Sequence, residues 1–339
     1  MVPVLDNNKQ PLMPCSEKRA RKLMEKGQAK AYWKQGIFSI ILQKEPSGRN
    51  TQDVVCGIDP GSKRTGVTVT TSKRAVLNIL IDTPSWVKEA VETRRNLRRS
   101  RRNRKTPYRK CRFNRKIGRL PPSTKARWQT HLRVINVLES LIPLTDIAIE
   151  DIKAVSKKGA RKWNVNFSPL EVGKKWFESQ LTIKLYKFEG FKTKEHRDYR
   201  EFKKTKEKLA DRWEAHNVDS HSLCEMVVGE ILPFKGLIKC NLLRFHRRQI
   251  HVQNFSKGGN RKCYGGTISL GIKRGTLVRH LKYGKCFVGG SSNGRLSLHS
   301  VETGKRLTQG ANKEDLITLS RLIWRSAFLP HLKEWYPAD

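Results

Sequence analysis

Short hydrophobic runs separated by turn residues mark the first half of the chain. Three runs, at residues 54–58, 65–70 and 75–81, are rich in aliphatic residues and are separated by Gly, Ser and Lys. This spacing predicts an antiparallel meander of three strands. The apolar run at residues 134–142 fits a helix, and residues 146–150 fit a buried strand that ends in an acid. Three strands, a helix and a further strand predict an α/β domain.

Two smaller modules flank this domain. In residues 1–48 we expect a helix over residues 16–27, with Ser16 as its N-cap and Gly27 as its C-cap, and then a strand-like aromatic run at residues 31–42. Residues 258–310 hold twelve of the 24 Gly between strand-like runs, which predicts a small β-barrel or meander. In between, Ser168 to Glu171 form a capping box that opens a helix, and residues 223–231 continue as an apolar helix.

One segment carries almost no apolar residues. Residues 94–116 contain thirteen Lys or Arg and no acid, and Pro107 is the expected end of their helical part. A helix without an apolar face gains little from a protein core, and an ordinary solvated face would mix charges of both signs. We therefore expect RNA or DNA to contact its basic side chains, which are Arg94, Arg95, Arg98, Arg99, Arg101, Arg102, Arg104 and Lys105.

The composition points to the same class of partner. The 339 residues include 70 Lys and Arg against 30 Asp and Glu, a formal net charge of +40. Such an excess disfavours a compact chain unless a polyanion neutralises it, so nucleic acid is the expected ligand. The hydrophobic content of 37% is too high for a disordered polycation.

Compartment and redox state follow from what the sequence lacks. We expect a cytoplasmic protein without a membrane partner, because no apolar run is long enough to span a bilayer and residues 1–9 do not resemble a secretory signal. Seven Cys occur without any Cys-x-x-Cys pair, which argues against a zinc ribbon and against a disulfide framework. The thiols should be reduced and mostly buried.

Four polar residues stand next to apolar sequence and are the candidate catalytic and metal-binding groups. Asp59 and Glu150 each end a predicted strand, and His216 with Asp219 lie at a predicted helix start, three residues apart and so on one face of a helical turn. Carboxylates at neighbouring strand ends are suitable ligands for divalent cations, and His216 could take the proton of an attacking water. Taken singly, each has a plainer interpretation: a turn at Asp59, a solvated strand end at Glu150, a surface histidine and a helix cap.

The order of these motifs resembles a known family. Residues 57–62 (Gly-Ile-Asp-Pro-Gly-Ser), 147–151 (Ile-Ala-Ile-Glu-Asp) and 216–219 (His-Asn-Val-Asp) resemble the three split motifs of RuvC-like nucleases. The basic helix lies where IscB proteins and type II CRISPR effectors have their bridge helix. Residues 11–14 (Pro-Leu-Met-Pro) resemble the PLMP motif of IscB-type proteins. The resemblance implies an RNase H-like core split by insertions, with an N-terminal PLMP module and a β-rich C-terminal domain.

One departure narrows the resemblance. IscB and the CRISPR effectors carry an HNH nuclease domain between the second and third motifs, whereas residues 151–215 contain a single histidine, His196. The arrangement is therefore similar to the HNH-lacking IsrB family, which implies an RNA-guided nickase that cuts the displaced DNA strand. The implied divisions are residues 1–50 (PLMP), 51–85 (RuvC part I), 86–120 (bridge helix and basic extension), 121–160 (RuvC part II), 161–235 (helical segment and RuvC part III) and 236–339 (C-terminal domain).

The resemblance also implies a cofactor and partners. Asp59, Glu150 and Asp219, assisted by His216, would hold two Mg²⁺ ions, for which Mn²⁺ could substitute. Partners would be a guide (omega) RNA, a double-stranded DNA target with an adjacent motif, and the RNA–DNA heteroduplex, around a monomeric protein. Two alternatives remain open: a non-catalytic RNA-binding scaffold and a guide-independent RuvC-type resolvase. The roles of Asp151 and His221 are undecided.

Overall fold

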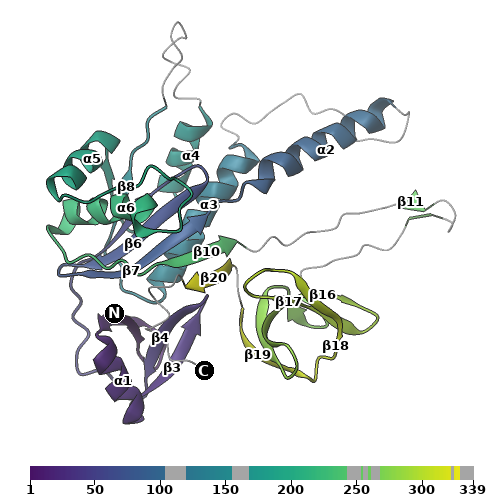
Figure 1. Cartoon of the computed structure of the whole chain (residues 1–339), viewed down its shortest axis with the longest axis horizontal. Coiled ribbons are helices and arrows are strands. Elements are labelled where there is room, and N and C mark those ends of the chain that lie inside the picture. The colour runs from purple at the N-terminus through teal and green to yellow at the C-terminus, as the bar shows by residue number, and fades with distance from the viewer. Residues whose placement is uncertain are drawn as a thin grey trace, which may run out of the picture.

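A seven-stranded mixed sheet forms the centre of the protein, which we describe from a computed structural model (Figure 1). The strand order is β20-β10-β7-β6-β5-β8-β9. The structure describes residues 1–103, 120–154, 168–242, 253–254, 259–260, 268–321 and 324–328. Helices cover both faces of the sheet, as the α/β prediction requires.

The predicted meander is present at the middle of this sheet. Strands β5 (Val54–Asp59), β6 (Arg64–Thr71) and β7 (Ala75–Asp82) pair antiparallel in chain order. Strand β8 (Asp146–Glu150) has the predicted bounds and lies parallel to β5. Because β5 and β8 run the same way, their carboxyl ends meet at one edge of the sheet.

Three outer strands of the sheet were not predicted. They are β9 (Lys184–Phe188), parallel to β8, β10 (Ile238–Leu242), parallel to β7, and β20 (Trp324–Phe328), antiparallel to β10. The last two come from residues 236–339, so the expected C-terminal domain shares two strands with the central sheet. Strand β10 does alternate apolar and polar residues, but its partner β7 lies far away in the sequence.

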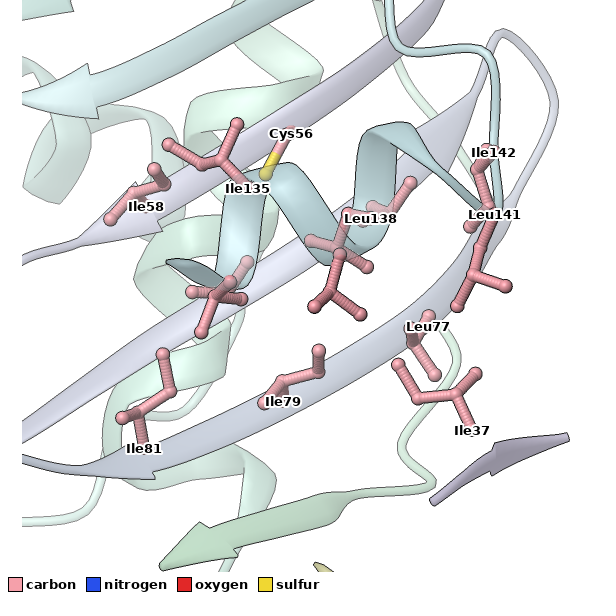
Figure 2. Packing of buried hydrophobic residues seen from close by; sticks show 14 of the residues in the cluster. Ile37, Cys56, Ile58, Leu77, Ile79, Ile81, Ile135, Leu138, Leu141 and Ile142 are labelled. Carbon is pink, nitrogen blue, oxygen red and sulfur yellow. The ribbon is translucent and has the colours of Figure 1, made fainter. Parts of the chain in front are cut away.

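Helix α3 (Pro122–Glu139) covers one face of the sheet. Its Ile135 and Leu138 pack against Ile58 and Ile79 of the strands in one buried cluster (Figure 2). The helix begins well before the apolar run that predicted it. Its first turns are mostly polar, so the hydrophobic pattern did not predict them, although Trp128 is buried there.

Helix α6 (Trp213–Val228) covers the opposite face and approaches the strands closely. A Cβ atom added at Gly57 would lie 2.0 Å from the carbonyl oxygen of Ser220, and one added at Gly66 would lie 2.6 Å from the carbonyl of His216. These two glycines therefore let the backbone of α6 pass directly over β5 and β6. The helix begins at Trp213, so His216 and Asp219 lie near its start, as the sequence predicted.

The N-terminal module has its own sheet, in the order β2-β1-β4-β3. Its elements are β1 (Val2–Leu5), β2 (Pro11–Cys15), α1 (Glu17–Glu25), β3 (Ala29–Lys34) and β4 (Ile37–Leu42). The predicted N-cap is present, since the Ser16 side chain accepts from the Arg19 N–H. The strand-like run at residues 31–42 is in fact a hairpin, because Gln35 and Gly36 adopt φ of 55° and 81° and reverse the chain.

The glycine-rich region contains a five-stranded antiparallel sheet in the order β18-β17-β16-β15-β19. These strands are β15 (Thr276–His280), β16 (Gly284–Ser292), β17 (Arg295–Ser300), β18 (Arg306–Ala311) and β19 (Leu316–Arg321). Two short pairs precede it: β11 (Gln253–Asn254) with β12 (Gly259–Asn260), and β13 (Ile268–Ser269) with β14 (Ile272–Lys273). The sheet has a small core of its own that includes Val278 and Leu298. The β-rich prediction therefore holds for this region.

The remaining helices lie along the chain between strands of the central sheet. The basic helix α2 (Trp86–Asn103) starts earlier than expected, and Pro107, Arg104 and Lys105 lie outside the described residues. Helix α4 (Pro169–Glu178) is capped by Ser168, which accepts from the Glu171 N–H as predicted. Helix α5 (Gly190–Tyr199) lies between β9 and α6.

Two expectations about the compartment can be compared with the structure. Among the described helices, none is both long and apolar enough to cross a membrane. The five cysteines within the described residues are free thiols, and four of them are buried.

We expect Gly57→Ala to destabilise the protein, because the added methyl group would overlap the Ser220 carbonyl and force α6 away from β5. Overpacking of this kind costs about 1–3 kcal/mol in the free energy of unfolding, which urea titration would measure. Gly48→Ala is the matched control, since its Cβ would meet nothing within 4 Å. Equal stability of the two variants would contradict the close contact.

Candidate metal centre

Three carboxylates converge at the carboxyl edge of the central sheet. Asp59 ends β5 and Glu150 ends β8, and the register that pairs Ile58 with Ile149 places them side by side. Asp219 reaches the same point from α6. One oxygen of each carboxylate lies within 4.8 Å of the others. The structure thus brings together the three acids that the sequence singled out.

Crowding of like charges perturbs this cluster. Asp59 and Asp219 are buried and Glu150 is partly buried. Burial raises the pKa of Glu150 to about 7, with further contributions from the negative charges of Asp59 and Asp219, while Lys204 opposes the shift. Three carboxylates so close together repel one another unless cations neutralise them.

His216 is held by both ring nitrogens. Its Nδ1 lies 2.9 Å from Asp59 Oδ2 and its Nε2 lies 3.0 Å from the carbonyl oxygen of Lys208. Burial lowers the pKa of His216, but the hydrogen bond and charge of Asp59 and the Lys208 carbonyl outweigh burial, so its pKa is raised. With two acceptor oxygens in place, the imidazolium form fits best because both nitrogens can then donate.

Two basic side chains neutralise Asp219, and the sequence did not single out either of them. Arg197 Nη1 on α5 donates to Asp219 Oδ1 at 2.6 Å, and the Lys204 ammonium donates to Asp219 Oδ2. Both residues lie in a stretch of residues 192–212 that is rich in Lys and Arg. No sequence signal separates them from their basic neighbours, because their role depends on where α5 packs.

Asn217 fixes the first turns of α6 over the sheet. Its side-chain amide donates to the carbonyl oxygens of Val67 on β6 at 3.0 Å and Ile79 on β7 at 3.2 Å. Next to it, the hydroxyls of Thr68 and Ser220 lie 2.7 Å apart in a hydrogen bond between strand and helix. These buried polar contacts set the position of α6, and therefore of Asp219 and His216.

The two undecided residues lie outside the cluster. Asp151 accepts from the Lys174 ammonium at 2.7 Å, and its carboxylate is not part of the three-acid group. His221 is fully buried two residues after Asp219 on α6, where its Nε2 lies 3.4 Å from Glu225 Oε1. Neither side chain adds a ligand to the centre.

The donor set fits a hard divalent cation. Its ligands are carboxylate oxygens held on rigid strand ends and on a packed helix, which is the chemistry that Mg²⁺ or Mn²⁺ requires. Burial and the neighbouring negative charges raise the pKa of Glu150, and a bound cation would favour its ionised form. Asp59, Glu150 and Asp219 are therefore the residues that could hold such an ion.

The basic helix forms a separate feature. Side chains at residues 88–100 of α2 are all exposed, including Leu97 at 57%. Within the described part, the exposed arginines are Arg94, Arg95, Arg98, Arg99 and Arg102. Figure 1 shows α2 projecting away from the sheet. The helix therefore offers an exposed basic surface from Arg94 on, while the acidic centre lies at the sheet edge.

One family comparison covers the N-terminal part of the chain. Residues 2–162 match the protein family described as "RRXRR protein". The pattern in that description occurs in α2 at residues 98–102, whose sequence is Arg-Arg-Ser-Arg-Arg. The matched range includes Asp59 and Glu150 but ends before His216 and Asp219. No curated protein matches the sequence of the chain.

Several solved structures show partial similarity. RuvC of T. thermophilus in complex with a Holliday junction substrate has 15% identity and a TM-score of 0.26, over 44% of this chain and 73% of that one. A second structure of Thermus thermophilus RuvC has 18% identity and a TM-score of 0.22, over 42% and 68%. The ROK hexokinase from Thermus thermophilus has 10% identity and a TM-score of 0.24, over 43% and 37%.

The raised pKa of Glu150 predicts that the metal-free protein loses stability with rising pH. The pKa of the Glu150 carboxyl is higher in the folded protein than in the unfolded chain. Its protonated form therefore favours the folded state at pH values below the pKa of the unfolded chain. This contribution is lost as the pH rises through about 7, the pKa in the folded protein. His216, whose pKa is also raised, acts in the same direction. Melting temperatures in chelator should therefore fall between about pH 5 and pH 8.

Glu150→Gln should flatten this fall, because the neutral amide cannot gain the charge. Glu92→Gln on the exposed face of α2 is the control and should leave the profile unchanged. An unchanged profile in Glu150→Gln would show that Glu150 does not carry the effect.

Proposed function

We propose that the protein is a metal-dependent DNA endonuclease guided by RNA, which nicks the displaced strand of its target. The observation that carries the proposal is the convergence of Asp59, Glu150 and Asp219 at one sheet edge. The RRXRR domain, which is found in IscB-type nucleases, supports the same conclusion. We further propose membership of the HNH-lacking IsrB group, with the domain divisions that the resemblance implies.

The three carboxylates would hold two Mg²⁺ ions, or Mn²⁺ in their place. A pair of such ions supplies charge for the attacking and leaving oxygens of a phosphodiester. The protein contributes the rigid placement of its ligands: β5 and β8 fix two of them through their parallel register, and α6 fixes the third. A binding-only scaffold would have no need of three repelling carboxylates at one point.

His216 would take up the proton of the attacking water. In the structure both of its nitrogens face acceptors, so it can accept a proton only after losing one of its own. The contact with Asp59 therefore favours the charged form of the imidazole for as long as Asp59 faces Nδ1. His216 also ties Asp59 to the segment around Lys208, which positions that carboxylate.

The basic surfaces would hold the nucleic acids. The basic part of helix α2 from Arg94 on buries no side chain within the described residues, and a guide RNA with its heteroduplex would neutralise its arginines from several sides. Base pairing would supply the sequence information that a chain of this size cannot read alone. The sheet of the C-terminal region, with exposed Arg279, Arg295 and Arg306, would contact the adjacent motif of the duplex.

Purification with RNA expressed from the flanking DNA tests the whole proposal. The particle is incubated with Mg²⁺ and a randomised plasmid library, and each strand is scored separately. A nick confined to the unpaired strand is the expected result. Bound RNA without cutting would indicate the scaffold alternative, and cutting of branched DNA without RNA would indicate a resolvase.

Asp59→Ala should abolish nicking while RNA binding remains, because the variant loses one metal ligand and leaves α2 untouched. Rates on a mapped target and RNA affinity by filter binding would measure both properties. Asp53→Ala is the matched control, since Asp53 is exposed just before β5 and should cut at the wild-type rate. Robust cutting by Asp59→Ala would overturn the site assignment.

Replacing Arg98, Arg99 and Arg102 together with Gln should weaken RNA binding and flatten its salt dependence. Each lost phosphate contact lowers the slope of log affinity against log salt by about 0.7 to 0.9, so the slope should drop by about 2 to 3. A triple change of exposed Lys18, Arg21 and Lys22 on α1 removes the same charge and should have a smaller effect. If both triple variants showed the same slope of log affinity against log salt, the loss of RNA binding would depend on net charge alone and not on helix α2.

A further inference from the structure

Asp219 is engaged by protein cations at both of its oxygens. Arg197 donates to Oδ1 at 2.6 Å, and the Lys204 ammonium donates to Oδ2. The side chain of Asp219 is only 3% exposed, so these contacts are made inside the cluster and not in solvent. A divalent ion that uses Asp219 as a ligand must therefore share an oxygen with one of the two cations or displace it, and both arrangements place like charges side by side.

The two cations differ in how firmly they are held. Arg197 is 13% exposed and lies on α5. That helix is fixed to α6 by Arg200, whose Nε and Nη2 each lie 3.2 Å from an oxygen of buried Glu225. Lys204 is 37% exposed and lies in the irregular segment between α5 and α6. Its long side chain has room to turn outward, whereas Arg197 does not.

The segment after Lys204 is anchored across the centre. The Lys208 carbonyl accepts from His216, and Asp211 pairs with Arg64 at 2.8 Å and with Lys239 at 2.8 Å. The backbone that carries Lys204 therefore stays next to the carboxylates even when its ammonium group no longer contacts Asp219. An ammonium released from Asp219 would remain within reach of any anion bound at the same edge.

The charge balance explains why such an exchange is favourable. Lys204 lowers the pKa of Glu150 and so partly performs the neutralisation that the three carboxylates need. Once a divalent ion takes over that task, an ammonium on Asp219 would face a cation instead of an uncompensated acid. The nearest new source of negative charge is the phosphate of a bound strand.

We propose that Lys204 is an exchangeable cation. Its ammonium pairs with Asp219 in the metal-free protein and, when metal binds, moves to a phosphate of the nucleic-acid strand bound at the centre. The second half rests on the proposed nuclease function, whereas the first half rests only on the contacts of Asp219. Lys204 would thus be a phosphate-binding residue whose contact becomes available only in the metal-loaded protein.

Metal affinity tests the first half without any cleavage. Free Mn²⁺ is measured by electron paramagnetic resonance during titration of the full-length, metal-free protein. Lys204→Met should bind Mn²⁺ about fivefold more tightly, because a competing cation has been removed. Lys206→Met, an exposed neighbour in the same segment, should match the wild type. Asp219→Asn should weaken binding and identify the site.

Equal Mn²⁺ affinity for Lys204→Met and the wild type would overturn the exchange. Lys204→Arg guards against a folding artefact, since it keeps the charge and should retain the wild-type affinity. Tighter Mn²⁺ binding by both variants would show that loosening of the segment, and not loss of charge, causes the effect.

Phosphate contact is tested with a target whose cut site has been mapped. A neutral methylphosphonate replaces the phosphate at that site, and binding is measured with Ca²⁺, which should support binding with little cutting. The wild type and Lys206→Met should lose affinity on this change, and Lys204→Met should lose about threefold less. An equal loss in all three proteins would overturn the phosphate assignment.

The two proposals fail in distinguishable ways. If the wild type never cuts any target but Lys204→Met still binds Mn²⁺ more tightly, the nuclease function and the phosphate contact are overturned and the exchange stands. If the wild type nicks its target but Mn²⁺ affinity does not depend on Lys204, the nuclease stands and the exchange is overturned.

Discussion

The close contact between helix α6 and the central sheet is the constraint on which the candidate centre depends. Two of its ligand positions lie on neighbouring strands and meet through parallel register alone, but the third must come from the opposite layer. Gly57 and Gly66 provide the space for this approach, and Asn217 fixes it with hydrogen bonds to two strands. A wider separation would leave Asp219 too far from Asp59 to share an ion with it.

The close packing brings three carboxylates together, and nearby cations offset part of their mutual repulsion. The chain has a formal charge of +40, yet three of its 30 acids converge in a partly buried site. Arg197 and Lys204 engage Asp219, and His216 engages Asp59. Burial and the two neighbouring acids raise the pKa of Glu150 to about 7. These contacts offset part of the repulsion among the three carboxylates, and a divalent ion would offset more of it.

Two segments outside the strands of the sheet differ in their relation to the centre. The segment of residues 189–212 supplies the cations and the Lys208 carbonyl at the centre, so it belongs to the site although it bears no recognisable motif. Helix α2 instead points away from the sheet with an exposed basic surface. The chain thus separates an acidic site, able to bind metal, from basic surfaces able to bind polyanions. Both are properties that the proposed function needs.

The sequence by itself determined the elements whose signals are local. The meander, strand β8, the cap at Ser16, the β-rich region and the acids at strand ends all follow from the order of apolar, turn and polar residues. Only the tertiary structure decided which distant segments meet. Strands β9, β10 and β20 join the sheet, a hairpin replaces one strand-like run, and Arg197 and Lys204 reach Asp219. The reason is physical: hydrophobic period and turn chemistry act over a few residues, whereas strand pairing and ion pairing depend on distances in space that the fold alone sets.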